Sequence, residues 1–237
     1  MGIQQAPASV DTRRAITGWL ARTVLAIPFI GAIIFWTAGT TNWLNAWVYL
    51  VWYLVVSVAA VFVTDPSLLA ERSGSRRVKG QKGWDKVLMG IYGMLTPLVL
   101  PIVAALDFRF GWSPEIALWL QVAGFVVYAL GWALHLWAMA ANRYHALVVR
   151  IQEDLGQTVV TGGPYRCVRH PSYVGAVLQA ISAPLLLGSG WALIPGVLGG
   201  LLMVLRTALE DRMLQRELDG YQEYAARVRY RLLRGVW

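Results

Sequence analysis

The sequence predicts an all-α fold: a polytopic transmembrane bundle of five to six helices, the last two a short hairpin, with a small cytoplasmic C-terminal cap. Of the 237 residues, 57% are hydrophobic and 14% are charged. The mean hydropathy is +0.51. This composition excludes a water-soluble single domain. Long apolar runs, each near or above the roughly 20 residues that cross about 30 Å of hydrocarbon, indicate the membrane helices.

Four of these runs predict complete spans, at residues 19–38, 43–63, 87–106 and 115–141. A fifth apolar region, 173–205, is too long for one helix and is interrupted at 188–190 by the sequence Gly-Ser-Gly. It therefore predicts two short helices that turn back on each other. Each arm has ~15 residues, or roughly 22 Å of helix, so five and six crossings both stay open.

Basic residues fall almost entirely on one side of this layout. All of the 21 lysines and arginines except Arg109 lie at the N-terminal end, in the 64–86 loop, in the 142–172 segment or after residue 205. The positive-inside bias then places both termini and the 142–172 segment in the cytoplasm. Basic segments that face anionic lipid explain the net charge of +8, and no nucleic-acid partner is predicted. The first 18 residues lack the apolar core of a signal peptide, which predicts an uncleaved first span.

Two regions are expected along the chain. Residues 1–141 would hold the N-terminal membrane helices and the cytoplasmic loop 64–86, which begins with a short amphipathic helix. Residues 142–237 would hold a polar segment, the helical hairpin and a cytoplasmic tail. In the tail, a helix is expected to continue to Asp219, stop at Gly220 and give way to a second amphipathic segment near 221–229.

The most informative stretch is TGGPYRCVRHPSYVG, residues 161–175, which places three basic groups and two tyrosines between apolar regions. His170 precedes Pro171, which biases it away from helical geometry and places it at the start of the next helix. A lone histidine usually serves packing. Here Tyr165, Arg169 and Tyr173 accompany it at the mouth of an apolar hairpin, which favours a binding site.

Glycine and cysteine in this stretch have simpler interpretations. Gly162, Gly163 and Gly175 suit turns and helix packing, or the close approach of a ligand to the backbone. Cys167 is the only cysteine, which excludes an internal disulfide and a multi-cysteine metal centre, and no metal is predicted. Its role is left open.

Two further polar groups follow apolar helices. Arg206 and Glu210 are four residues apart and share a helix face, where an interfacial salt bridge worth a few tenths of a kcal/mol is the plain interpretation. Their position directly after an apolar hairpin favours a functional role. Asn142 and His145 follow the fourth span, where such residues are also ordinary at a membrane border.

The spacing G-P-Y-x-x-x-R-H-P-x-Y-x-G, followed by R-T-A-L-E-D at 206–211, resembles the isoprenylcysteine carboxyl methyltransferase and phospholipid methyltransferase superfamily of integral membrane enzymes. The D-P-S-L-L-A-E-R sequence at 65–72 and N-x-x-H at 142–145 resemble further segments of it. The resemblance implies catalytic roles for Arg206 and Glu210. Asp211 stands where the family has a second glutamate, which leaves its role open. The resemblance also implies an S-adenosyl-L-methionine site made by Asn142, His145, Tyr165, Arg169, His170, Pro171, Tyr173, Gly175 and Glu210.

Methyl transfer from a sulfonium requires alignment of donor and acceptor within about 3–3.5 Å and exclusion of water. Arg206 suits a substrate carboxylate, which favours carboxyl O-methylation of an isoprenylcysteine-like or other lipidic acceptor. Methylation of a phospholipid amine or a small thiol stays open, and for an amine no general base is obvious. The expected partners are the lipid bilayer and a lipid-like or small-molecule acceptor, with the active site facing the cytoplasm.

Two other classes of function stay open at this stage. Membrane sterol and enone reductases have a similar C-terminal helical layout and bind NADPH in a comparable pocket. A non-enzymatic lipid-binding or scaffold protein is the third alternative. The sequence predicts neither the identity of the acceptor nor the oligomeric state.

Overall fold

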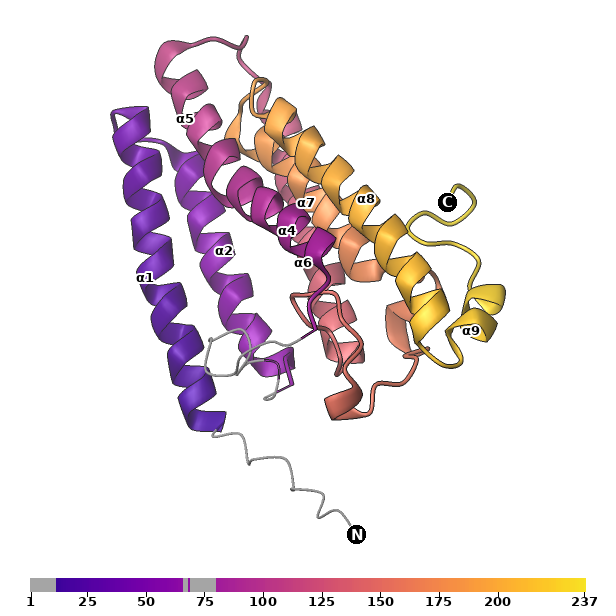
Figure 1. The fold of residues 1–237 in the computed structure, drawn as a ribbon. Helices are drawn as coiled ribbons and strands as arrows, with labels where there is room; N and C mark the ends of the chain where they lie inside the picture. Colours follow the sequence, from indigo (N-terminus) through magenta and orange to yellow (C-terminus); the bar gives the residue numbers. More distant parts are fainter. Residues whose placement is uncertain (1–11, 66–67, 69–79) are drawn as a thin grey trace.

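The structure is a computed structural model that describes residues 12–65, 68 and 80–237. Throughout these ranges the regular elements are helices, which confirms the predicted all-α class (Figure 1). Within the described ranges, five helices are long and apolar enough to cross a membrane, at Ile16–Ala38, Leu44–Val63, Gly83–Phe110, Leu118–Ala141 and Leu193–Glu217. Their lengths and composition are those of an integral membrane protein with several spans.

The first two spans are α1 (Thr12–Ala38) and α2 (Leu44–Val63), which run side by side at one edge of the bundle (Figure 1). Small residues allow their neighbours to approach closely. Ala46 of α2 and Ala104 of the third span are fully buried in a core that also contains Ile34 and Leu100. This core holds the non-polar end of the bundle together.

The third span contains a change of helix type. It consists of α4 (Gly83–Met94), a π-helical segment (Leu95–Val99) and α5 (Leu100–Phe110). Pro97 lies within the π-helical segment, and because proline has no backbone N–H it cannot complete the ordinary α-helical ladder there. The span ends at Gly111, whose φ of 61° is left-handed.

The predicted hairpin is confirmed. Its arms are α7 (Pro171–Leu187) and α8 (Leu193–Glu217), and the chain reverses at Gly188 with a φ of 73°. With 17 residues, α7 is shorter than the five spans, whereas α8 has 25 and extends past the apolar region. Helix α6 (Leu118–Ala141) packs closely against α7 at two glycines, Gly131 and Gly175. A Cβ atom on Gly175 would lie only 2.5 Å from the carbonyl oxygen of Gly131, so no larger residue fits there without a shift.

The C-terminal cap folds against the end of the hairpin. Helix α8 ends at Glu217, two residues before the predicted Asp219, and Gly220 with a φ of 77° leads into α9 (Tyr221–Arg227). Between α6 and α7, residues 142–170 are mostly irregular, with 3₁₀ turns at Glu153–Leu155 and Gly163–Arg166. The amphipathic helix expected after Asp65 falls mainly on 66–67 and 69–79, which lie outside the described residues.

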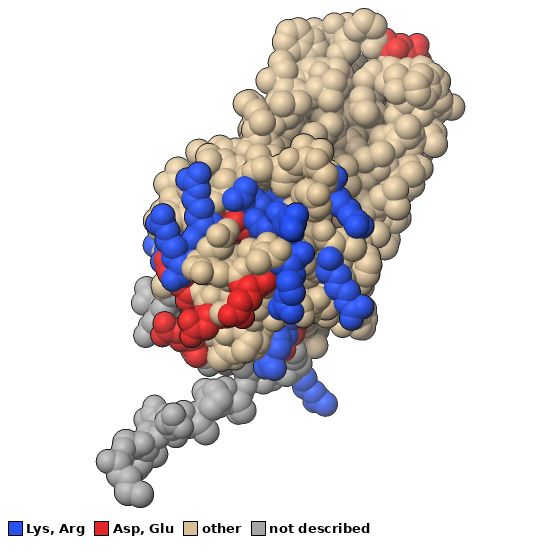
Figure 2. All heavy atoms as spheres, turned by 90° about the vertical axis from the view of Figure 1, so that its right-hand side faces the viewer, with Lys and Arg blue, Asp and Glu red and all other residues tan. Residues whose placement is uncertain are grey.

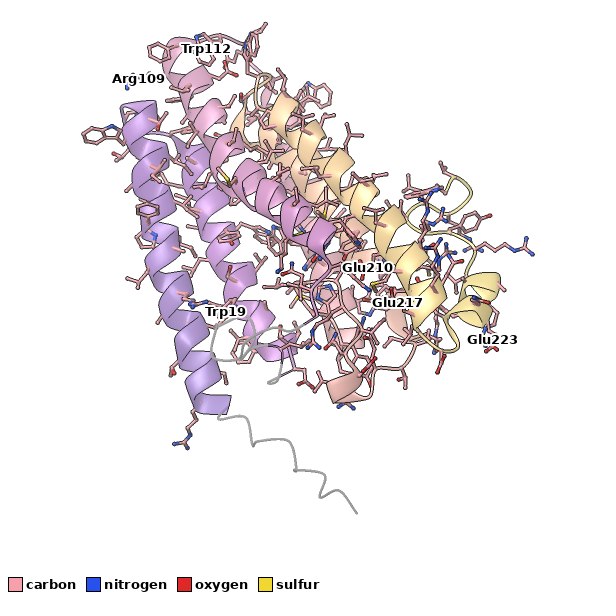
Figure 3. The ribbon with its side chains drawn as sticks, viewed as in Figure 1. Trp19, Arg109, Trp112, Glu210, Glu217 and Glu223 are labelled. Atoms are coloured by element: carbon pink, nitrogen blue, oxygen red, sulfur yellow. The ribbon has the colours of Figure 1, made fainter. Side chains whose placement is uncertain are left out.

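Charged residues gather at one end of the molecule. Figure 2 shows lysine and arginine concentrated over the end that carries the C-terminal cap, while on this face the other end shows only a small acidic patch. In Figure 3, Glu210, Glu217 and Glu223 lie at the charged end, and Arg109 and Trp112 lie at the opposite one. The polar motif and the predicted catalytic pair are therefore at the charged end of the bundle.

Candidate active site

A polar cavity of about 90 Å³ lies at the charged end of the bundle. Its walls come from the 142–170 segment, the start of α7, the second half of α8 and the region of α9. Seven of the residues predicted to bind the cofactor line it: Asn142, His145, Tyr165, Arg169, His170, Tyr173 and Glu210. The structure therefore brings together residues that are up to 68 positions apart in the sequence.

A second, larger cavity of about 340 Å³ lies among the membrane helices. Its size is in the range of small-molecule sites. Apolar side chains dominate its walls, and the π-helical segment contributes Thr96 and Pro97. Trp132 Nε1 and Gln179 Nε2 belong to lining side chains and have no hydrogen-bond partner among the described residues. The cavity therefore offers polar contacts as well as apolar surface. Arg206 lines this cavity and not the polar one.

The two cavities share a wall made of His145, Ala146 and Tyr173. The ring of Tyr173 stacks on His170, with ring centroids 5.5 Å apart and an interplanar angle of 7°. Its hydroxyl donates a hydrogen bond to the carboxylate of Glu210. On the other side, the guanidinium carbon of Arg206 lies 5.1 Å from the Tyr173 ring centroid. Tyr173 is thus the side chain that links the predicted cofactor and catalytic residues.

Arg206 is paired with Asp85, not with Glu210, which corrects the salt bridge considered from the i,i+4 spacing. Arg206 Nε donates to Asp85 Oδ1 over 2.8 Å, and Nη2 donates to the carbonyl of Leu147 over 2.8 Å. The other carboxylate oxygen of Asp85 accepts from the backbone N–H of Val149. Both side chains of the pair are buried. Arg206 Nη1 has no hydrogen-bond partner among the described residues, and the side chain lines the membrane cavity.

Asp211 is the centre of the hydrogen-bond network that holds the cap. Its carboxylate receives two hydrogen bonds from Arg169, over 2.7 and 3.0 Å, and one each from Arg231, Tyr221 and Gln215. The side chain is fully buried. Because charge-assisted, bidentate pairs are among the strongest hydrogen bonds in proteins, Asp211 ties α8 to the motif and to the tail.

Arg169 lines the polar cavity, but its guanidinium is directed mainly at the protein. Besides Asp211, it donates from Nη1 to the carbonyls of Val228 and Arg229. Burial opposes its charged form, but the hydrogen bonds and the charge of Asp211 outweigh burial and raise the pKa of Arg169. The arrangement favours a positioning role for Arg169 over direct binding of a ligand.

Tyrosines complete the network. Burial, followed by the charge of Asp211, raises the pKa of Tyr221, and the Tyr224 hydroxyl donates to the carbonyl of Tyr165 over 2.7 Å. Burial also raises the pKa of Tyr165, whose hydroxyl accepts a hydrogen bond from Asn142 Nδ2 over 3.2 Å. These phenols stay neutral at physiological pH and act as hydrogen-bonding groups.

Two predicted cofactor residues do not line either cavity. Pro171 is buried at the first position of α7, where it fixes the start of the helix and the position of His170. Gly175 serves the close packing of α7 on α6. Cys167 is exposed and also lies outside both cavity walls.

Sequence reasoning missed several residues of the site. Val148, Arg150 and Gln152 line the polar cavity, whereas Val149 is buried in the neighbouring apolar core and Ile151 packs against it. An extended segment presents alternate residues to opposite faces, so the alternation at 148–152 was a signal for these positions. Asp85 was visible only as an acidic residue at the start of an apolar span.

Residues 119–219 match the family model described as phospholipid methyltransferase. The match runs from the start of α6 to just beyond α8, so it includes the polar motif, Arg206, Glu210 and the wall between the cavities. It confirms the resemblance to the membrane methyltransferase superfamily over this part of the chain, and gives no support to the reductase alternative. A comparison with curated proteins finds no match.

Proposed function

We propose that the protein is an S-adenosyl-L-methionine-dependent methyltransferase that modifies a lipid-like acceptor held among its membrane helices. The observation that carries this proposal is the wall of His145, Ala146 and Tyr173, which separates a polar cavity from a mainly apolar one. A charged methyl donor and an apolar acceptor need such different surroundings. They must also meet within about 3–3.5 Å in a site without bulk water.

The polar cavity has the groups that S-adenosyl-L-methionine requires. Glu210 offers a carboxylate for the ammonium of the donor, and Arg150 offers a guanidinium for its carboxylate. Asn142, His145, Tyr165, His170 and Tyr173 offer further polar contacts around them. When bound there, the donor would supply an electrophilic methyl group. The chain would contribute its orientation and the exclusion of water.

Arg206 is suited to hold the acceptor. Its Nε and Nη2 are fixed by Asp85 and Leu147, while Nη1 is left for a ligand in the membrane cavity. A carboxylate at this position would gain a charge-assisted hydrogen bond next to Tyr173, at the wall between the cavities. Since a carboxylate is already an anion, it needs no general base. Carboxyl O-methylation of an isoprenylcysteine-like or other lipidic acceptor is therefore the reaction we favour.

Methylation of a phospholipid amine is the second candidate. The description of the matching family favours it. The charges near the shared wall favour it too. The carboxylates of Asp85 and Glu210 carry two negative charges there, and the guanidinium of Arg206 carries one positive charge. Such a balance suits a cationic head group.

We also propose that the charged end faces the cytoplasm, because it carries the basic residues that favour this side of a membrane (Figure 2). Native Cys167 is exposed at this end and provides a probe. An impermeant thiol reagent should leave it unlabelled in intact cells and label it after permeabilisation. Labelling in intact cells would contradict this orientation.

The proposed cofactor is tested by calorimetry on the purified protein with S-adenosylhomocysteine and with NADPH. We expect binding of S-adenosylhomocysteine alone. His170→Ala should weaken it at least about tenfold, because the imidazole lines the polar cavity and supports Tyr173. Binding of NADPH alone would refute the methyltransferase proposal.

A further inference from the structure

Gln152 is an almost completely buried residue of the polar cavity with an incomplete set of hydrogen bonds. Its side chain lines the cavity, although only 2% of the residue is exposed. Nε2 donates to the carbonyl of Tyr144 over 2.6 Å, and the backbone N–H donates to Gln157 Oε1 over 2.8 Å. Gln152 Oε1 has no hydrogen-bond partner among the described residues.

The orientation of this amide is determined by its partner. A backbone carbonyl can only accept, so the atom 2.6 Å from Tyr144 O must be the nitrogen of the amide. The unpartnered atom is therefore an acceptor. Buried polar side-chain atoms in proteins are nearly always hydrogen-bonded, and Gln152 is a lining residue of the polar cavity, so its unpartnered oxygen suits a hydrogen bond from a ligand.

The surroundings identify the kind of donor. Arg150 lines the same cavity two residues before Gln152, and two residues of extended backbone span roughly 6.6 Å. The positive charge of Arg150 therefore disfavours a cationic ammonium beside Gln152. The ammonium has a better partner in Glu210, which hydrogen-bonds to Tyr173 at the shared wall. Gln152 does not line the membrane cavity, whereas the methyl group must reach that wall. Gln152 thus suits a neutral donor remote from the methyl group.

We infer that Gln152 Oε1 accepts a hydrogen bond from the exocyclic amine of the adenine ring of the methyl donor. This inference rests on the proposed function and extends it to a specificity residue. In S-adenosyl-L-methionine, the ribose adjoins the sulfonium, while the adenine amine lies at the far end of the nucleoside. A hypoxanthine ring has a carbonyl oxygen in place of this amine, so two acceptors would face each other at Gln152.

Calorimetry with S-adenosylhomocysteine and S-inosylhomocysteine tests this assignment without an activity assay. The wild-type protein should prefer the adenine ligand by about tenfold to a hundredfold, because the inosine ligand leaves the buried acceptor unpartnered. Gln152→Leu should lower affinity for the adenine ligand and leave little preference between the two. Thr158→Val is the matched control, since it removes another polar side-chain group that lines the same cavity and should keep the preference.

The possible contrary results are distinct. Equal affinity of the wild-type protein for both ligands would overturn the assignment even if Gln152→Leu did not fold. If Gln152→Leu lost the same amount of affinity for both ligands, Gln152 would contact the ribose or stabilise the loop instead. This result would also overturn the assignment. Failure of the wild-type protein to bind S-adenosylhomocysteine at all would overturn the proposed function itself.

Discussion

Arg206 Nε lies 2.8 Å from Asp85 Oδ1, although 121 residues separate the two in the sequence. The pair joins the start of the third span to the middle of α8 and sets the direction of the guanidinium. Asp85 is completely buried and also receives hydrogen bonds from Gln81 and from the backbone of Val149. The carboxylate of Asp85 thus holds both the loop that forms a wall of the polar cavity and the arginine that lines the membrane cavity.

Replacing Asp85 with asparagine should therefore affect both stability and catalysis. Removing one partner of a buried ion pair leaves an uncompensated charge and typically costs about 3–5 kcal/mol. Thermal unfolding in detergent should show this loss. If the variant folds, turnover should fall more than affinity for S-adenosylhomocysteine, because Arg206 lies on the acceptor side.

The matched control for Asp85 is Glu217→Gln, which removes the ion pair between Lys82 and Glu217 at the same junction of helices. Both side chains of that pair are partly exposed, so its loss should cost less than about 1 kcal/mol. Equal stability losses for Asp85→Asn and Glu217→Gln would contradict the role given to the buried pair.

Asp211→Asn should loosen the C-terminal cap. The variant keeps the shape of the side chain but loses the charge that Arg169 and Arg231 share. We expect faster proteolysis within residues 218–237 and weaker binding of S-adenosylhomocysteine, because α9 lines the polar cavity. Asp219→Asn, at an exposed position nearby, should change neither property. A cap that stays protected in Asp211→Asn would show that the network is dispensable.

Gly175→Ala should destabilise the bundle, because the new methyl group would lie 2.5 Å from the carbonyl oxygen of Gly131 on α6. Overpacking of this kind costs about 1–3 kcal/mol. Gly162 belongs to the same motif, but a methyl group there meets no atom within 4 Å. Unfolding temperatures of Gly175→Ala and Gly162→Ala measure the difference. If Gly175→Ala keeps wild-type stability yet loses cofactor affinity, Gly175 has the binding role first expected from the motif.

Arg206→Lys should keep the positive charge and lose the planar fork that contacts Asp85 and Leu147. With a carboxylate acceptor, turnover should fall by roughly 10²–10³-fold, the usual effect of removing one preorganised donor. Affinity for S-adenosylhomocysteine should stay within a few-fold of wild type. Unchanged turnover with the best acceptor would argue against the carboxylate role and favour an amine or thiol.

Much of the fold could be predicted from the sequence because membrane spans are set by local composition. The hairpin followed from Gly188, whose left-handed backbone ends α7. The side-chain contacts of the site were harder to predict, since they depend on packing between elements that are distant in the sequence. Spacing alone suggested a pair between Arg206 and Glu210, yet Asp85 approaches from another span and Glu210 turns to Tyr173.

The same limit explains the roles of Asp211 and Gln152. The sequence shows Asp211 only as a carboxylate beside a predicted catalytic residue. Its role becomes clear from the structure, in which Arg169, Tyr221 and Arg231 donate hydrogen bonds to it. Gln152 belongs to a segment without regular structure, where only the alternation of apolar residues gave a local signal. Gly175 shows the reverse case, because the motif suggests a binding residue at a position where the structure shows close packing of α7 on α6.

The central claim is that a methyl donor in the polar cavity modifies a lipid-like acceptor in the membrane cavity. The most direct measurement follows an isotopically labelled methyl group from S-adenosyl-L-methionine, using purified protein in lipid nanodiscs with lipid carboxylates, amines and thiols. We expect label in the product of a lipid-like acceptor, and far less with Arg206→Lys if that acceptor is a carboxylate. Binding of S-adenosylhomocysteine without transfer to any of these acceptors, or transfer to water-soluble acceptors alone, would contradict the claim.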